Sequence, residues 1–573
     1  MSRAALLALL ALATCEGPPE TCGSWLQWGG DPTHAGATCS AALPMARQLG
    51  EVQIDPFIMG ETADGFGDIY VHYQVPLIAG DDVYVEAKSG AYTPCTPPMP
   101  PMMPNQVCAP YRLNSENWDE VLVHWEGNHL VQKWTFHSDW KPPPYDGFEP
   151  MFQPAIVGDR LYVPAAGGAL TIVDRHSGAT IGKIAPFAID PDTYVASPVA
   201  ADSAGNVYYT TLSLNHDDPW NTDAHGFLVT ATPAGTIKTV PFESMVANAP
   251  INCRTTFNRM DNPLPWPPPP NPDGTPALPP LAPCGTQRPG LNAAPAIAPD
   301  GTIYVVSKAH MNARYSYVIA LNADLTPKWS TSLRGFLNDG CGVTIPLDGD
   351  AMDHKYDCRP GTAMGVDPAT NEQPATRVID DSSSSPVALP DVGVLYGSHT
   401  SYNDARGHLL KLDAGGHVVA TYDFGWDTTP AIYRHDGTYS ILLKDNHYLY
   451  DANGVDLGPY YIVRLDRNLK PEWKLQSTNT MSCTRVPGQT DLVCTDDHPH
   501  GFEWCINAPA VDRDGTVYAN SEDGWVYAID KNGHVTQRIF LDMSIGAAYT
   551  PLAIDGRGLI YTLNAGKLSV VGP

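Results

Sequence analysis

One short phrase recurs along the chain and organises its apolar residues. Each copy has a proline, a few apolar residues, a polar turn and a second apolar run that carries a tyrosine. The eight copies are at Pro76, Pro154, Pro198, Pro295, Pro386, Pro430, Pro509 and Pro551. Two short apolar runs around a turn rich in Gly and Asp are typical of adjacent antiparallel strands. The sequence therefore predicts the same strand pair in each copy.

The spacing of the copies predicts how these strand pairs are arranged. The shortest spacing is 42 residues, between Pro509 and Pro551. Residues 508–541 contain four apolar or alternating runs separated by Gly-containing turns. Repeats of about 40–45 residues with four strands each are typical of propeller blades, which bury their faces against their neighbours. We therefore expect an all-β fold, an eight-bladed β-propeller of four-stranded antiparallel blades.

The last copy lacks a strand. It has three clear strand-like runs before Pro573, so its sheet would keep an unpaired edge. We expect the fourth strand to come from Arg47 to Ile54 and to close the ring.

Long insertions interrupt the repeat at one kind of position. They fall between the second and third strands of a blade or between successive blades, which are connections at the same end of a propeller. The ranges are 92–111, 215–225, 249–290, 308–314, 335–384, 400–406, 445–458 and 478–503. Long loops on one face favour a binding surface; alternatively, the insertions pack on each other and cover the channel.

The N-terminus predicts export. Arg3 precedes an apolar run from Ala4 to Ala13, which is too short to span a bilayer and is typical of a secretory signal. Cys15 follows in a lipobox-like context and is a candidate for lipidation, while cleavage after Ala13 would give a secreted or periplasmic protein. We expect residues 1–14 to be a signal peptide, 15–46 an entry segment and 47–573 a single propeller domain.

The 12 cysteines agree with export. Their spacings do not resemble those of zinc ligands. Neighbouring cysteines predict five local disulfides that staple the insertions and the entry segment. The pairs are Cys22–Cys39, Cys95–Cys108, Cys253–Cys284, Cys341–Cys358 and Cys483–Cys494. Cys505 is left over and could compete for Cys483 or Cys494.

Composition narrows the function classes. The chain has 50 Gly and 55 Pro among 573 residues and a formal net charge of −28 at pH 7. Frequent helix breakers argue against helical bundles. The negative charge repels nucleic acid and anionic lipid, so we expect membrane contact only through a lipid anchor.

The repeats resemble the pyrroloquinoline-quinone (PQQ)-like β-propeller family. The units GTIYVVS and GTVYANSEDGWVYAIDKNG match its strand pattern, and Trp25 to Gly36 resembles its entry segment. Trp134, Trp329 and Trp473 match the tryptophan that locks neighbouring blades in that family. The resemblance covers about residues 24–573 and implies the fold. Its members include quinoprotein dehydrogenases and an outer-membrane assembly lipoprotein, so it leaves the activity open.

Polar and aromatic residues near the repeated prolines form the main candidate site. They are expected around the channel mouth, where carboxylates, amides and aromatics could hold a cation or a polar ligand. The candidates are Gln74, Gln153, Asn292, Asp380, Asp381, Trp426, Asp427, Trp504 and Asn507. A solvated rim is the alternative reading. His498 and His500 could ligate a transition metal, or they belong to a polar loop.

Two functions remain. The insertions, and the lack of nucleophile-elbow, phosphate-loop and HExxH motifs, favour an exported or outer-membrane-anchored monomer that binds a protein or a small polar ligand. The alternative is a PQQ- and calcium-dependent oxidoreductase, as the family resemblance implies. Such enzymes place adjacent cysteines at the quinone, and this sequence has no such pair. We therefore expect no PQQ, although calcium could bind at the channel mouth.

Overall fold

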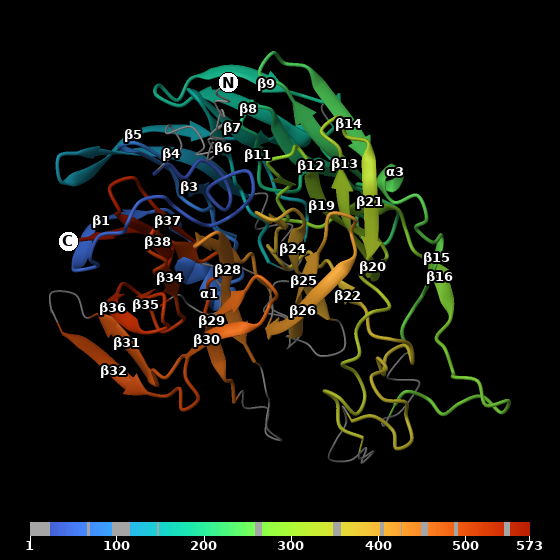
Figure 1. Ribbon diagram of the computed structural model, residues 1–573. Helices are drawn as coiled ribbons and strands as arrows, with labels where there is room; N and C mark the ends of the chain where they lie inside the picture. The colour runs from blue at the N-terminus through green and yellow to red at the C-terminus, as the bar shows by residue number, and fades with distance from the viewer. Residues whose placement is uncertain are drawn as a thin grey trace, which may run out of the picture.

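Eight antiparallel sheets stand around a central axis, as Figure 1 shows. The computed structural model describes residues 23–65, 69–93, 115–145, 148–188, 190–257, 266–347, 357–400, 406–425, 427–447, 457–485, 491–543 and 551–573. Each sheet has four or five strands. The predicted eight-bladed β-propeller is confirmed.

The first four blades follow each other in chain order. Blade one contains β2 (Leu77–Ala79), β3 (Asp82–Gly90), β4 (Glu116–Glu126) and β5 (His129–His137). Blade two contains β6 (Ala155–Val157), β7 (Arg160–Ala165), β8 (Ala169–Asp174) and β9 (Thr180–Ile184). Blade three contains β10 (Thr193–Val195), β11 (Ala200–Ala201), β12 (Val207–Ser213), β13 (His225–Ala231) and β14 (Ile237–Pro241). Blade four contains β17 (Gln287–Pro289), β18 (Ala296–Ile297), β19 (Ile303–Ala309), β20 (Asn312–Leu321) and β21 (Pro327–Ser332).

The other four blades complete the ring. Blade five contains β22 (Thr376–Arg377), β23 (Val387–Ala388), β24 (Val394–Thr400), β25 (Arg406–Leu412) and β26 (Val418–Gly425). Blade six contains β27 (Ala431–His435), β28 (Thr438–Asn446), β29 (Tyr460–Asp466) and β30 (Pro471–Gln476). Blade seven contains β33 (Ala510–Val511), β34 (Val517–Asn520), β35 (Trp525–Ile529) and β36 (Val535–Phe540). Blade eight contains β37 (Leu552–Ile554), β38 (Ile560–Asn564), β39 (Lys567–Gly572) and β1 (Arg47–Gln53).

Blade eight joins the two ends of the described chain. β1 runs antiparallel to β39, with Arg47 opposite Gly572 and Gln53 opposite Lys567. Figure 1 shows the blue β1 beside the red strands of this blade. The segment expected to complete the blade therefore supplies its outermost strand and pairs the edge of β39.

The tyrosine of the repeat phrase anchors the turn before it. In blade three, Tyr208 donates its hydroxyl to Asp202 Oδ2 at 2.9 Å, and Asp202 Oδ1 accepts the N–H groups of Ala204 and Asn206 at 2.9 Å. One carboxylate thus holds the turn and satisfies a hydroxyl. The same pairs, also six positions apart, are Asp512 with Tyr518 and Asp555 with Tyr561.

Three tryptophans on outer strands dock on the next blade. Each indole N–H donates to a carbonyl in the turn between the neighbour's third and fourth strands. The bonds are Trp134 to Arg175 O (3.2 Å), Trp329 to Ala414 O (2.9 Å) and Trp473 to Lys531 O (3.0 Å). The interblade role implied for these tryptophans is confirmed.

Gly533 tests how much this docking contributes. Its φ is 82°, and an added Cβ would lie 2.9 Å from Trp473 Cδ2. The left-handed backbone alone costs a residue with a Cβ about 1–2 kcal/mol. We therefore expect Gly533→Ala to lower the free energy of unfolding by more than this amount, because the indole must also move. Chemical denaturation measures the loss.

Gly235→Ala is the matched control. Gly235 has a φ of 86° in the corresponding turn of blade three, and an added Cβ there meets nothing within 4 Å. Equal losses in the two variants would show that the tryptophan contact contributes no stability.

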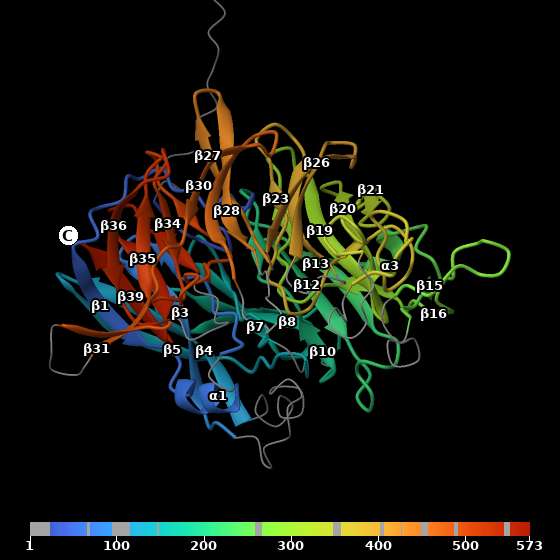
Figure 2. The same cartoon turned by 90° about the horizontal axis from the view of Figure 1, so that it is seen from below.

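Two insertions between blades carry hairpins of their own. One hairpin is β15 (Asn252–Arg254) with β16 (Leu281–Pro283), and the other is β31 (Met481–Arg485) with β32 (Leu492–Asp496). Figures 1 and 2 both place them at the outer edge of the ring. The remaining short elements are α1 (Ile58–Asp64), η2 (Ala166–Gly168) and α3 (Phe242–Met245). None of the helices in the described ranges has the length and hydrophobicity needed to cross a membrane.

Three of the five predicted disulfides are confirmed. Cys253–Cys284, Cys341–Cys358 and Cys483–Cys494 are bonded, and each lies in an insertion. Cys39 is also disulfide-bonded, but its expected partner Cys22 lies outside the described residues, as do Cys15, Cys95 and Cys108. Cys505 is a buried thiol whose Sγ lies 3.5 Å from Glu522 Oε1.

Candidate functional site

Amides that precede the repeated prolines link the blades to one another. Each is buried and accepts a backbone N–H from a segment leading into another blade. The bonds are Gln153 Oε1 from Val75 N (2.8 Å), Asn292 Oδ1 from Met151 N (2.8 Å) and Asn507 Oδ1 from Thr429 N (2.5 Å). A buried N–H without an acceptor is costly, so these amides stabilise the ring whether or not they also meet a ligand.

Asp380 lies in a buried cationic setting. Arg288 donates to both carboxylate oxygens, at 2.9 and 2.7 Å, and Lys308 Nζ lies 2.6 Å from Oδ2. Burial opposes ionisation of Asp380, but these two cations outweigh it and hold its pKa far below the usual range. Burial lowers the pKa of Lys308 to about 8, against the pull of Asp380.

Asp427 lies in a hydroxyl-rich setting. Its Oδ2 accepts the Ser383 N–H at 2.8 Å and an Asn507 side-chain N–H at 2.9 Å. Lys444 Nζ lies 3.5 Å from Oδ1. The structure thus brings together Asp427 and Asn507, two of the predicted residues, while their neighbour Trp426 lies outside the described residues.

Neither carboxylate has the surroundings of a typical calcium site. Calcium takes six to eight oxygen ligands. Both oxygens of Asp380 already face cations, and Asp427 Oδ2 faces N–H donors that calcium would have to displace. These contacts are more typical of buried polar groups that link one blade to another than of a calcium site. The expectation that calcium could bind at the channel mouth therefore stays a prediction, and so does the expectation that PQQ does not bind.

Asp381 and Gln74 also belong to the predicted set. Asp381 is partly buried and accepts the Phe148 N–H at 3.3 Å; burial raises its pKa. Gln74 is fully buried and donates to Glu120 Oε1 at 3.2 Å. Burial raises the pKa of Glu120 to about 8, against the lowering effect of the Gln74 hydrogen bond.

Glu120 gives a pH-dependent prediction. Between its ordinary pKa of 4.5 and about 8, the folded protein keeps a proton that the unfolded chain has lost. Stability contributed by this proton falls as the pH rises through that window. Glu120→Gln cannot titrate, so its Tm relative to the wild type should increase from pH 5 to pH 8 and level off above. A Tm difference that stays constant over this range would contradict the assignment.

A buried lysine forms a charged centre that sequence patterns did not reveal. Lys88 Nζ lies 3.0 Å from Asp55 Oδ2, 2.9 Å from Glu61 Oε1 and 2.9 Å from Glu149 Oε2. Burial alone lowers the pKa of Lys88, but these carboxylates outweigh it and raise the pKa well above its ordinary value. The centre ties α1 and the segment after β1 to blade one. A signal in the sequence was the placement of Glu86 and Lys88 directly after the apolar run 83–85 of β3.

His498 lies in a surface loop and contacts two other residues of that loop. Its ring stacks on Phe502 with a centroid distance of 3.7 Å, and its Nδ1 is 2.6 Å from Asp497 Oδ1. Over the described ranges, the clusters of three potential metal ligands include neither His498 nor His500. Metal binding by these histidines stays a prediction.

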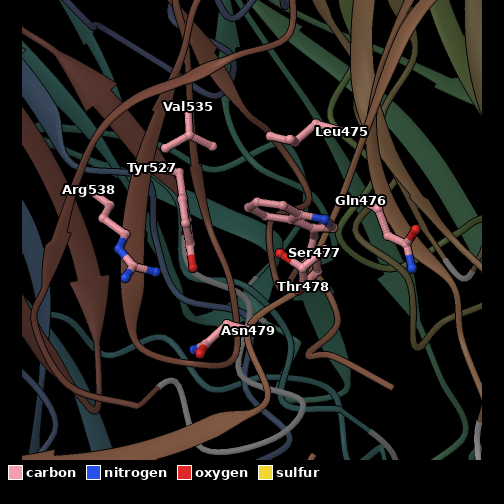
Figure 3. A pocket seen from close by; sticks show the side chains of 9 residues that line it. Leu475, Gln476, Ser477, Thr478, Asn479, Tyr527, Val535 and Arg538 are labelled. Carbon is pink, nitrogen blue, oxygen red and sulfur yellow. The ribbon is translucent and has the colours of Figure 1, made fainter. Parts of the chain in front are cut away.

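A pocket of about 400 Å³ opens between blades six and seven. Figure 3 shows Tyr527 and Arg538 on one side, with Asn479 below them, and Leu475 and Gln476 on the other side. Rigid strands therefore supply much of the wall: β30 from blade six, and β35 and β36 from blade seven. Sequence reasoning missed these residues because they are distant along the chain.

Trp504, one of the predicted site residues, lines this pocket. It is 2% exposed, and its ring packs edge-on against Tyr527 with a centroid distance of 5.2 Å. Trp504 and the stretch 477–479 are the two ends of the insertion that carries β31 and β32. The pocket thus lies at the base of a disulfide-stapled insertion.

The polar groups of the pocket have defined supports. Tyr527 donates its hydroxyl to Asp523 Oδ2 at 2.6 Å, and Asn479 donates to the same oxygen at 2.9 Å. The guanidinium of Arg538 lies 4.3 Å from the centre of the Trp525 ring. This arrangement combines an aromatic wall with fixed polar groups, as small-molecule sites do.

Comparisons with solved structures show the same fold. One match is a europium-containing methanol dehydrogenase, with a TM-score of 0.50 and 10% identity over 94% of this chain and 89% of that one. Another is the quinohemoprotein alcohol dehydrogenase from Comamonas testosteroni, with a TM-score of 0.50 and 9% identity over 96% of this chain and 81% of that one. Likeness at this level shows the fold and does not transfer an activity.

A further match is too distant to support any conclusion. BamB from Moraxella catarrhalis has a TM-score of 0.38 and 10% identity, over 92% of this chain and 99% of that one. No protein-family model and no curated protein sequence matches the chain.

Proposed function

We propose that this protein is an exported, non-catalytic binding module that holds a small polar ligand in the pocket between blades six and seven. The observation that carries the proposal is the pocket itself. Its volume of about 400 Å³ lies within the range of small-molecule sites. Leu475 and Val535 offer apolar surface beside the largely buried Trp504 and Tyr527, while Arg538 and Asn479 offer polar contacts.

The surroundings of the pocket support a binding role. Three disulfides in insertions favour an oxidising compartment and therefore export. The Cys483–Cys494 bridge staples the insertion whose two ends line the pocket. A site built on strands and a stapled loop is held in place before the ligand arrives, which lowers the cost of binding.

A mixed fragment panel tests the proposal. Neutral, anionic and cationic fragments are screened by ligand-observed NMR against the wild-type protein and the Val535→Trp variant, which fills the pocket. Val535 lines the pocket and is 41% exposed, so the larger side chain should not disturb the core. We expect at least one fragment that binds the wild type and not the variant.

Val419→Trp is the matched control. Val419 is 55% exposed on β26, the outer strand of blade five. Fragments specific to the pocket should still bind this variant. If no fragment is lost selectively in Val535→Trp, the pocket is not a ligand site. Native mass spectrometry of the same preparation examines the alternative, because retained PQQ would favour an oxidoreductase.

A further inference from the structure

We infer that the pocket between blades six and seven selects a sugar acid, that is, a hydroxylated ring that carries a carboxylate. This inference rests on the proposed function and specifies the class of ligand. It combines three features of the pocket wall: an available guanidinium, an aromatic surface and a row of amide and hydroxyl side chains.

The guanidinium of Arg538 is held in place but not neutralised. It is exposed and stacks on Trp525 at 4.3 Å, which restricts its motion without removing its charge. Over the described ranges it forms no ion pair, although it interacts electrostatically with the buried Asp523. A ligand carboxylate can therefore form the bidentate contact that arginine geometry favours.

The acid behind the pocket is already engaged by other donors. Asp523 is fully buried. Its Oδ2 accepts Tyr527 at 2.6 Å and Asn479 at 2.9 Å, and its Oδ1 accepts the Trp525 N–H at 2.9 Å. Three donors already engage Asp523, whose carboxylate holds Tyr527 in place. Arg538 also interacts with Asp523 and with the Tyr527 hydroxyl, but its guanidinium is exposed and can still meet a ligand carboxylate.

The remaining wall suits a hydroxylated ring better than a purely apolar one. Trp504 and Tyr527 line the pocket but are only 2% and 8% exposed, so they offer a small aromatic surface to the C–H face of a sugar. Gln476 and Thr478 are exposed at the rim and can pair with ring hydroxyls.

Calorimetric titration of the full chain tests the inference with three probes: D-glucuronate, D-glucose and benzoate. We expect glucuronate to bind with one-to-one stoichiometry and roughly tenfold more tightly than either other probe, since a charge-assisted contact is worth at least one factor of ten. Arg538→Gln should bring glucuronate down to the affinity of glucose, and Arg538→Lys should keep part of the difference.

Arg513→Gln is the control for general charge loss. Arg513 is exposed on a turn of the same blade and does not line the pocket, so its removal should leave glucuronate binding unchanged. Melting curves of every variant confirm folding. Glucose or benzoate binding as tightly as glucuronate, equal losses in the two arginine variants, or no binding of any probe would each overturn the inference.

Different experimental outcomes would contradict the sugar-acid inference and the proposed ligand-binding function. A neutral or cationic fragment that is lost only in Val535→Trp would keep the pocket as a ligand site while glucuronate fails to bind. Loss of all selective fragments would remove the site altogether.

Discussion

Deletion of Gly50 to Ile54 is expected to abolish soluble, folded protein. These residues include the part of β1 that pairs with Lys567 to Val570 of β39. Without them, β39 becomes an unpaired edge and part of the apolar face of blade eight meets water. The segment also contributes the Ile54 carbonyl that accepts the Lys88 N–H at 2.7 Å. Soluble yield and thermal melting measure the effect.

A deletion of equal length is the control. Residues 271–275 form an exposed turn in the insertion before blade four. Removing them should change yield and Tm little, because loop shortening at an exposed turn disturbs few buried contacts. An unchanged Tm after deletion of Gly50 to Ile54 would contradict the structural role of β1.

Replacing Lys88 by Met should destabilise the fold severely. Asp55, Glu61 and Glu149 would then share a buried site without their cation. Breaking a buried ion pair from one side costs about 3–5 kcal/mol, and three carboxylates face this lysine. We expect loss of folded protein at pH 8 and partial recovery near pH 5, where the abandoned carboxylates can take up protons.

Lys133→Met provides the comparison on the same blade. Lys133 pairs with Glu126 at the surface, and such pairs contribute about 0–1 kcal/mol. Chemical denaturation at several pH values should therefore show a small loss for Lys133→Met with little pH dependence. If Lys88→Met were equally mild, or no more stable near pH 5 than at pH 8, the buried centre would not stabilise the fold as described.

The fold was predictable because local features repeat. Blades three, seven and eight share one kind of turn, in which Asp and Tyr recur six positions apart because the carboxylate holds the turn and accepts the hydroxyl. Trp473 could be recognised because the outer strands must dock on their neighbours. The short-range disulfides were predictable for a similar reason, since each closes a single insertion.

The pocket was only partly predictable because it is assembled from distant segments. Trp504 was identified from its place beside a repeated proline, but its partner Tyr527 and the cation Arg538 come from two other strands. On the sequence, Arg538 resembles any charged residue of an outer strand. Its role depends on stacking with Trp525, which follows from the pairing of β35 with β36. Lys88 was missed because a buried charge becomes interpretable only when its three acidic partners are in place.

The pairing of β1 with β39 also determines the order in which the molecule can be completed. Arg47 is synthesised long before its partner Gly572, so β1 must wait for the seven intervening blades and the rest of blade eight. Contacts between such distant positions form late, because the chain must lose loop-closure entropy before these contacts can contribute any stability. The growing chain can build inner blades one after another, but its ring stays open until β39 has been made. A chain interrupted before β39 would leave both its first strand and its last blade without partners, which makes it a natural substrate for quality control.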